Sequence, residues 1–137
     1  MNPAELMEFL NQGRVGVLST IRKDGSPQAS PVWFRYDGTT INIWTEKSRI
    51  WVKNVEMDGR VAFSVQEERP PFAAVLIRGN AHVSHQLDDS GLQEAKDISR
   101  LYIEESQLDK YVESSWPDLH TFVRIVLEHV RSWKRGY

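Results

Sequence analysis

Residues 14–36 read RVGVLSTIRKDGSPQASPVWFRY, and this stretch indicates how the chain folds. The run from Arg14 to Arg22 is rich in strand-forming residues, and so is the run from Pro27 to Tyr36. Between them, Lys23-Asp24-Gly25 is a turn signal, because an Asp-Gly pair readily adopts the backbone angles of a tight hairpin. The stretch therefore predicts two antiparallel strands joined as a hairpin.

Further strands are expected after this hairpin. A second Asp-Gly pair, Asp37-Gly38, leads into Thr39 to Thr45, where apolar and polar residues alternate, so a three-stranded meander is predicted. Alternation also predicts a strand over Arg60 to Gln66. Phe72 to Ser84 predicts a long strand, in which Gly79 is a site for a bulge or bend.

Four short helical segments are indicated by residues that favour helix starts. They are a helix opened by Asn2 and Pro3 and stopped by Gly13, a helix capped by Ser48 and running to Met57, a helix opened by a Ser90–Gln93 capping box and ending near Glu105, and a helical turn over Leu108 to Val112.

The C-terminal segment from Leu119 to Trp133 fits two structures. Its apolar residues recur at helical spacing, which periodicity slightly favours. However, Val123, Ile125 and Leu127 also alternate as they would in a strand. The residues alone leave helix and strand open.

Composition limits the classes of protein to consider. The chain has 137 residues, of which 40% are hydrophobic and 26% charged, so we expect one globular domain over residues 1–137. A net charge of −2 and a pI near 6.1 give no reason to expect nucleic-acid binding. Without a basic leader or an apolar run near the ~20 residues of a membrane span, we expect a cytoplasmic protein with no membrane partner.

Several kinds of chemistry lack their residues here. The chain has no cysteine, so thiolate nucleophiles are excluded and redox chemistry would need a bound cofactor. Dinucleotide, P-loop, zinc-protease and common hydrolase motifs are also missing. His82 and His85 are three residues apart in a predicted strand and would face opposite sides, so no metal site is expected.

One segment suggests an anion site. Trp44-Thr45-Glu46-Lys47-Ser48-Arg49, followed by Lys53, brings hydroxyls, cations and a predicted helix start together after a strand. Free backbone N–H groups at a helix start favour a phosphate. The alternative is an ordinary helix cap with solvated cations. Similarly, the five tryptophans either stack on a planar ligand or fill the core and dimer contacts; they are Trp33, Trp44, Trp51, Trp116 and Trp133.

The order of these motifs resembles the pyridoxamine 5'-phosphate oxidase-like family of split-barrel flavin and deazaflavin proteins, over nearly the whole chain. The matching motifs are Gly16–Thr20 with Asp24–Phe34, Trp44–Thr45 with Ser48–Arg49, Lys53–Val55 with Asp58–Val61, Pro70–Phe72 with Val75–Ala81, and Val130–Trp133. The resemblance implies a mainly β fold with short helices, a split β-barrel of about six antiparallel strands of the FMN-binding type. It also implies a final strand over Phe122 to Trp133.

The same resemblance implies which residues bind the cofactor. The second strand of relatives lies along the flavin ring, and this carries over to Gln28, Ala29, Ser30, Pro31 and Val32. The phosphate would be held at Trp44, Thr45, Ser48, Arg49 and Lys53. Relatives form homodimers with the cofactor site at the subunit interface, so the partner's Trp133 or the partner's Arg131 is also expected there.

The resemblance implies an FMN-dependent oxidoreductase that transfers hydride between the flavin and a small planar substrate. A first alternative is a reductase that uses the deazaflavin coenzyme F420, because Trp51 stands where relatives have a basic residue near the phosphate. A second is a protein that binds flavin or haem without catalysis.

Overall fold

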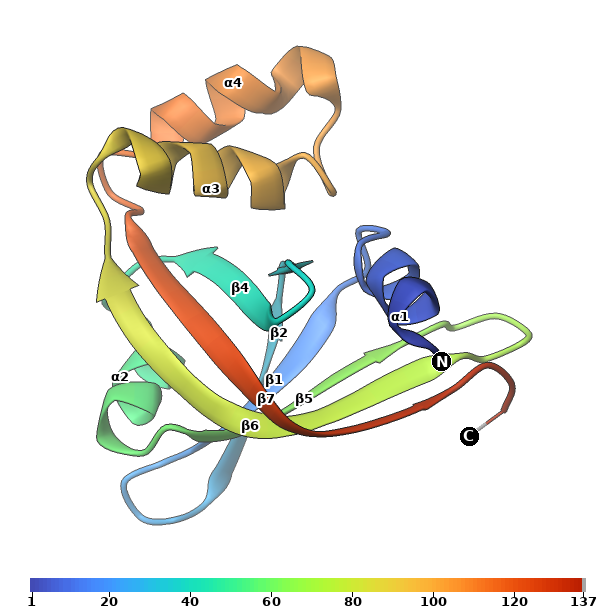
Figure 1. Cartoon of the computed structure of the whole chain (residues 1–137). Coiled ribbons are helices and arrows are strands. Elements are labelled where there is room, and N and C mark those ends of the chain that lie inside the picture. The colour runs from blue at the N-terminus through green and yellow to red at the C-terminus, as the bar shows by residue number, and fades with distance from the viewer. Residues whose placement is uncertain (137) are drawn as a thin grey trace.

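Seven antiparallel strands form one curled sheet, a half-barrel, in the computed structural model, which describes residues 1–136 (Figure 1). The order across the sheet is β2-β1-β5-β6-β7-β4-β3. The elements are α1 (Pro3–Leu10), β1 (Gly16–Ile21), β2 (Pro27–Val32), β3 (Arg35–Tyr36), β4 (Thr40–Thr45), α2 (Ile50–Met57), β5 (Arg60–Gln66), β6 (Ala74–His85), α3 (Asp89–Ser99), α4 (Glu105–Ser115) and β7 (Thr121–Trp133). The predicted mainly β split barrel with short helices is confirmed, with seven strands instead of six.

The first hairpin has the predicted form, but the predicted meander is wrong. β1 pairs with β2 from Gly16↔Val32 to Ile21↔Pro27. β2 then ends, and β3 pairs with β4 at the opposite edge of the sheet. The reason lies at Phe34, which is fully buried against Phe63 and whose backbone N–H and C=O both bond the Tyr102 hydroxyl. A side chain thus replaces the strand partner there, and the chain crosses to the other edge.

β6 and β7 are the longest strands and are paired along the whole of β6. The register shifts between Arg78 and Gly79, which confirms the bulge expected at Gly79. The C-terminal segment is therefore a strand, as the family resemblance implied. The helix that its apolar spacing slightly favoured is wrong. Its apolar spacing reflects a strand that is buried at its start and exposed beyond the bulge.

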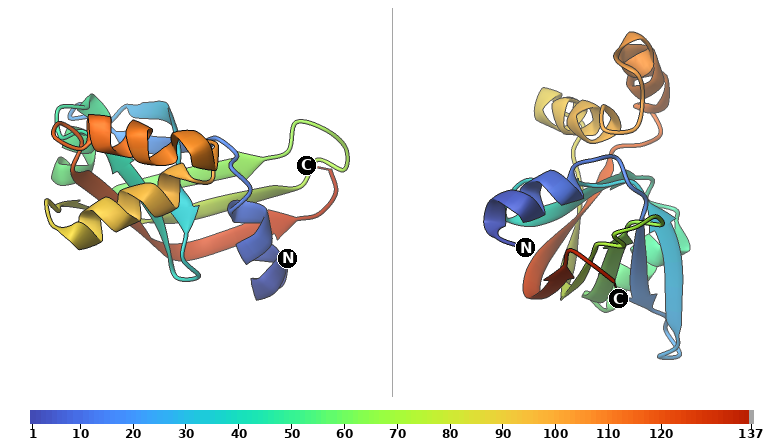
Figure 2. Two further views of the ribbon diagram at one scale, coloured as in Figure 1. Left: turned by 90° about the horizontal axis from the view of Figure 1, so that it is seen from above. Right: turned by 90° about the vertical axis from the view of Figure 1, so that its right-hand side faces the viewer.

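Two groups of buried side chains hold the elements together. The larger fills the half-barrel beneath α1 and α2, and its fully buried members include Leu10, Leu18, Phe34, Ile41, Ile43, Val52, Phe63, Ile77 and Ile125. The smaller joins α3 and α4 to the sheet through Ala95, Ile98, Leu108, Val112 and Phe122. Figure 2 shows α3 and α4 together at one end of the molecule, while both termini lie toward the other end.

The first two helices begin or end differently from the prediction. Asn2 caps α1 as expected, but α1 ends at Leu10, before Gly13, because the Asn11 side chain bonds both backbone groups of Tyr36. Ser48 does not cap α2. Its hydroxyl donates to the Glu46 carboxylate at 2.8 Å, and Arg49 occupies the N-cap position without a side-chain hydrogen bond.

The helix cap predicted at Ser90 is also wrong. The Asp88 carboxylate is the cap of α3, because it accepts from the Gly91 N–H at 2.9 Å, and the Ser90 hydroxyl donates to the same carboxylate. Serine and aspartate are both good caps, so composition alone did not separate them.

The helical hairpin differs from the prediction at its middle. α3 ends at Ser99 instead of near Glu105, because the chain turns where Tyr102 is held by the backbone of Phe34. α4 then forms a helix of 11 residues in place of the single turn predicted over 108–112. No helix within residues 1–136 has the length and apolar character needed to cross a membrane.

We predict that Gly79→Ala destabilises the fold. A Cβ at this position would overlap the carbonyl oxygen of Val126 in β7, so the central ladder must shift. The free energy of unfolding should fall by about 1–3 kcal/mol in urea titrations followed by tryptophan fluorescence. Lys23→Ala is the control, because Lys23 is exposed in the turn between β1 and β2 and its loss should change stability by less than about 0.5 kcal/mol. Equal losses in the two variants would contradict this account of the bulge.

Candidate functional site

A cavity of about 800 Å³ lies between β2, the end of β4, the start of α2 and the α3–α4 hairpin. Its volume is within the range of roughly 300–1,000 Å³ typical of small-molecule sites. It brings together eight of the residues predicted to bind a cofactor, namely Gln28, Ser30, Pro31, Val32, Trp44, Thr45, Ser48 and Arg49. Thus the segments after the first turn and after β4, separate in sequence, share one cavity.

Three predicted residues do not line this cavity. The Ala29 side chain is exposed, with its neighbours Gln28 and Ser30 turned the other way along β2. Lys53 is exposed on α2, one turn after Arg49. Trp133 ends β7, whereas Thr121, the partner of Thr45, begins it, so roughly 40 Å of strand at about 3.3 Å per residue separates them. Trp133 of the same protomer is therefore remote from the cavity.

β2 forms one wall of the cavity and one edge of the sheet. It pairs with β1, and its other side faces away from the ladder. Backbone groups on that edge are available to a ligand, and Pro27 and Pro31 are placed where a missing N–H breaks no ladder bond. Gln28, Ser30 and Val32 alternate toward the interior. The strand thus offers two polar side chains, one apolar side chain and free backbone groups.

Gln28 is oriented by Asn54, a residue for which sequence analysis predicted no role. Asn54 is buried on α2, and its amide group donates to Thr20 Oγ1 and to Gln28 Oε1, each at 3.1 Å. This leaves the Gln28 NH₂ group to donate toward a ligand. The signal was a polar residue on an apolar helix face, between Val52 and Val55.

The α2 end of the cavity is polar. Thr45 is buried at the end of β4, and Ser48 and Arg49 precede α2, whose first two N–H groups lack helical partners. Arg49 is exposed and forms no ion pair within residues 1–136. Glu46 also lines this end, where its carboxylate is held by the Ser48 hydroxyl. A cation, two hydroxyls and a helix start therefore meet here.

The opposite wall is aromatic and comes largely from residues that sequence analysis did not place in the site. Trp33 stacks on Tyr102 with ring centroids 4.6 Å apart and planes 3° from parallel. Tyr111 of α4 lies beside both Trp33 and Trp44. The Trp44 indole donates to the Leu119 carbonyl at 2.6 Å. These rings are joined only when the α3–α4 hairpin folds over the sheet.

Tyr102 fixes the corner between this wall and the sheet. Its hydroxyl accepts from the Phe34 N–H at 3.0 Å and donates to the Arg14 carbonyl at 2.8 Å. Burial raises the pKa of Tyr102 to about 12, so the hydroxyl stays protonated at neutral pH. The Tyr102 ring thereby provides a rigid base for Trp33.

Glu94 supplies a second tie between α3 and the sheet. Its Oε2 lies 3.6 Å from the Arg35 guanidinium, whereas its Oε1 is buried without a hydrogen-bond partner. Burial raises the pKa of the Glu94 carboxyl, and the lesser effects of Arg35 and Arg124 oppose this. Keeping this carboxylate charged beneath the hairpin is therefore unfavourable.

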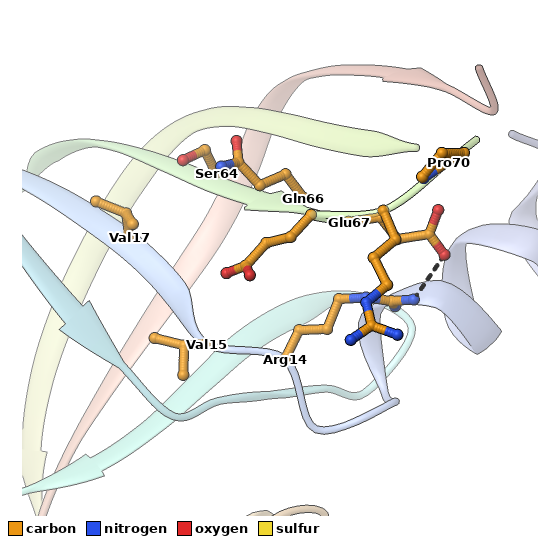
Figure 3. A pocket seen from close by; sticks show the side chains of 9 residues that line it. Arg14, Val15, Val17, Ser64, Gln66, Glu67 and Pro70 are labelled. Atoms are coloured by element: carbon orange, nitrogen blue, oxygen red, sulfur yellow. Dashed lines mark hydrogen bonds and ion pairs between the residues drawn. The ribbon is translucent and has the colours of Figure 1, made fainter. Parts of the chain in front are cut away.

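A second groove of about 710 Å³ adjoins the cavity at Val15, which lines both (Figure 3). Arg14 and Glu67 form a 3.0 Å ion pair there, drawn as the dashed line in Figure 3. Arg14 also lies over the Phe9 ring, 4.1 Å from its centroid. Arg69 and Glu68 also line this groove, so its two cations stand beside two carboxylates.

The structure shows no competing metal centre in the part of the chain it describes, residues 1–136, where no three His, Asp or Glu side chains could hold an ion together. His82 and His85 both lie on β6, and His85 Nδ1 is 2.9 Å from the Thr121 hydroxyl.

Comparisons with known proteins agree with this fold. A family model described as pyridoxamine 5'-phosphate oxidase matches residues 3–134. Among solved structures, the conserved hypothetical protein Rv2991 from Mycobacterium tuberculosis is 24% identical, with a TM-score of 0.82 over 98% of this chain and 85% of that one. An F420 reductase is 21% identical, with a TM-score of 0.70 over 90% and 94% of the two chains.

A third similar structure is HupZ of Group A Streptococcus, which is 14% identical, with a TM-score of 0.72 over 99% of this chain and 97% of that one. No curated protein matches the sequence. At these identities the solved structures establish the fold alone.

We predict that Glu94→Gln changes how stability depends on pH. The folded protein holds the Glu94 proton more tightly than the unfolded chain does, so wild-type stability falls as pH rises from the ordinary pKa of 4.5 through the raised folded value. Glutamine has no such proton. The unfolding free energy of the variant minus that of wild type should therefore be more positive at pH 7 than at pH 4 in urea titrations. A difference that stays constant, or becomes more negative, would contradict the assignment.

Proposed function

The chain belongs to the pyridoxamine 5'-phosphate oxidase family, and on that premise we propose that it binds FMN in the 800 Å³ cavity and transfers hydride between the flavin and a small planar substrate. The observation that carries the proposal is the meeting of the β2 edge, Gln28 to Val32, with the polar end at Ser48 and Arg49. These are the two surfaces that a flavin ring and its phosphate require.

The residues of β2 fit a flavin ring. Such a ring has a hydrophobic body and an edge of carbonyl and nitrogen atoms. The free edge of β2 and the Gln28 NH₂ group can donate to or accept from those atoms, while Val32 packs on the ring. Asn54 keeps Gln28 in place before the ligand arrives, which lowers the entropic cost of binding.

The α2 end fits a phosphate. Arg49 supplies a charge-assisted hydrogen bond, Thr45 and Ser48 supply hydroxyls, and the first turn of α2 supplies N–H groups. Lys53 lies one turn along α2 and adds positive charge at the rim. The Ser48 hydroxyl donates to the Glu46 carboxylate, so it must turn from Glu46 to donate to the phosphate when the anion binds.

A bound flavin supplies the hydride acceptor and donor, so no nucleophilic side chain is needed. The role of the protein itself is to orient the flavin and the substrate and to exclude water from the cavity. Gln28 and Ser30 would hydrogen-bond the ring edge and Arg49 would anchor the phosphate, while the aromatic wall of Trp33, Trp44 and Tyr111 lines the cavity on the hairpin side.

We also propose a homodimer that completes this site. The outer face of β1, β5 and β6 exposes Val17 and Leu76, at 40% and 39%, and Arg78 and Arg131 line the same face. An apolar patch on a sheet face favours a twofold partner. Val17 also borders the second groove, which joins the main cavity, so a partner on this face would reach the cavity mouth and present its own Trp133.

The deazaflavin coenzyme F420 is the second candidate. It has a longer anionic tail than FMN, and the cavity continues past Val15 into the second groove, where Arg69 is exposed. A protein of the same fold is named an F420 reductase. Titration of the purified protein with FMN and with F420, followed by fluorescence, distinguishes the two. Micromolar binding of neither would overturn the proposed function.

Arg49→Ala should weaken FMN but not riboflavin. Riboflavin has the same ring without the phosphate, so a loss confined to FMN identifies Arg49 as a phosphate ligand. We expect a loss of roughly ten- to a hundredfold for FMN, the value of a charge-assisted hydrogen bond, measured as the dissociation constant by flavin fluorescence. Lys47→Ala is the control, because Lys47 is an exposed cation of the same loop outside the cavity lining. Equal weakening of both flavins would show that Arg49 does not bind the phosphate.

Val17→Asp should dissociate the dimer and weaken cofactor binding. A carboxylate at this position would be buried without a partner on association, because the residues opposite Val17 across the ladder are Pro31 and Ser64. Sedimentation velocity is expected to show a dimer for wild type and a monomer for the variant, with weaker FMN binding. Leu87→Asp, at an exposed site before α3, should remain dimeric. A monomeric wild type, or a monomeric variant with unchanged FMN affinity, would contradict the shared site.

A further inference from the structure

The two ends of the cavity differ in charge. Among the described residues that line it, Glu46 and Arg49 carry charge, and both lie at the α2 end. The hairpin end is lined by the uncharged side chains of Trp33, Ile98, Ser99 and Tyr111. A ligand group at the hairpin end would therefore meet rings and aliphatic carbon.

Ser99 is the unusual residue of this wall. It is 1% exposed, it lines the cavity, and its Oγ has no hydrogen-bond partner within residues 1–136. Leaving a buried hydroxyl unsatisfied is unfavourable, and such groups in native proteins call for an explanation. A hydrogen-bonding atom of a ligand at this end of the cavity would satisfy it once the buried Oγ rotates toward the cavity.

The surrounding rings are held in place before any ligand binds. Trp33 is stacked on Tyr102, whose hydroxyl is bonded to the backbone of Phe34, and the Trp44 indole is bonded to the Leu119 carbonyl. Tyr111 lies across from both indoles at 6.1 and 6.4 Å between centroids. Fixed rings of this kind bind flat ligands at little entropic cost.

We propose that the hairpin end is the substrate subsite, and that it takes a planar, uncharged, conjugated ring carrying a carbonyl or hydroxyl group that bonds Ser99. The aromatic wall, above all Tyr111, contacts the ring. A phosphorylated or carboxylated substrate is disfavoured, because its charge would be buried where the lining holds no cation. This proposal rests on the proposed function in one respect, namely that the substrate ring lies next to a bound cofactor.

The first test uses 1,4-naphthoquinone, which is flat, neutral and bears two carbonyls, and its 2-sulfonate, which adds one negative charge. Equilibrium dialysis measures their binding to protein loaded with FMN or F420, whichever binds. The quinone should bind at least tenfold more tightly than the sulfonate. Equal binding of the two, or tighter binding of the sulfonate, would overturn the proposal.

The second test changes the two named residues. Ser99→Ala should weaken quinone binding by about three- to tenfold, the value of a neutral hydrogen bond. Ser106→Ala, at an exposed serine of α4, should leave it unchanged. Tyr111→Leu should weaken binding by a similar factor, whereas Tyr111→Phe, which keeps the ring, should not. Unchanged quinone binding in both Ser99→Ala and Tyr111→Leu would overturn the subsite.

The same dialysis without cofactor distinguishes failure of the subsite from failure of the proposed function. If neither FMN nor F420 binds but the quinone still binds with the expected dependence on Ser99 and Tyr111, the subsite stands and the flavin function falls. If a flavin binds and the quinone does not, the flavin site stands and the subsite falls.

Discussion

The pairing of β6 with β7 is the constraint on which the rest of this structure depends. Every residue of β6, from Ala74 to His85, has a partner in β7. β5, β1 and β2 extend the sheet on one side of this ladder, and β4 and β3 extend it on the other. The α3–α4 hairpin connects the two strands, so it must lie at the end where His85 meets Thr121. The cavity exists because β4 joins β7 at that same end.

This arrangement gives the cavity two chemically different ends. The α2 end has Arg49, hydroxyls and unpaired helix N–H groups, which suit an anion. The hairpin end has fixed aromatic rings and the buried hydroxyl of Ser99, which suit an uncharged ring. Tyr102 joins the α3–α4 hairpin to the sheet. Its hydroxyl bonds the backbone of Phe34, and its ring stacks on Trp33. A cofactor and a planar substrate could therefore be held side by side without a catalytic nucleophile.

Local patterns predicted much of the sheet. The turn at Asp24-Gly25, the alternation from Arg60 to Gln66 and the bulge at Gly79 all depend on neighbours in sequence, and all appear in the structure. The meander failed at Phe34, because a tyrosine 68 residues away takes its backbone hydrogen bonds. The cap at Ser48 failed because Glu46 accepts its hydroxyl. Residue propensities describe each residue by itself, so they do not predict which distant group a side chain or a backbone group will bond.

The sequence by itself determined the strand-forming segments, the first hairpin, the absence of cysteine chemistry and, through the order of its motifs, the family. It also singled out eight residues that share one cavity, because the motifs around Gln28–Val32 and Ser48–Arg49 are local. Only the tertiary structure decided that Asn54 orients Gln28, that Tyr111 and Ser99 form the opposite wall, and that Trp133 lies far from the cavity of its own protomer. These placements arise from pairings between segments distant in sequence, whose geometry no local pattern records.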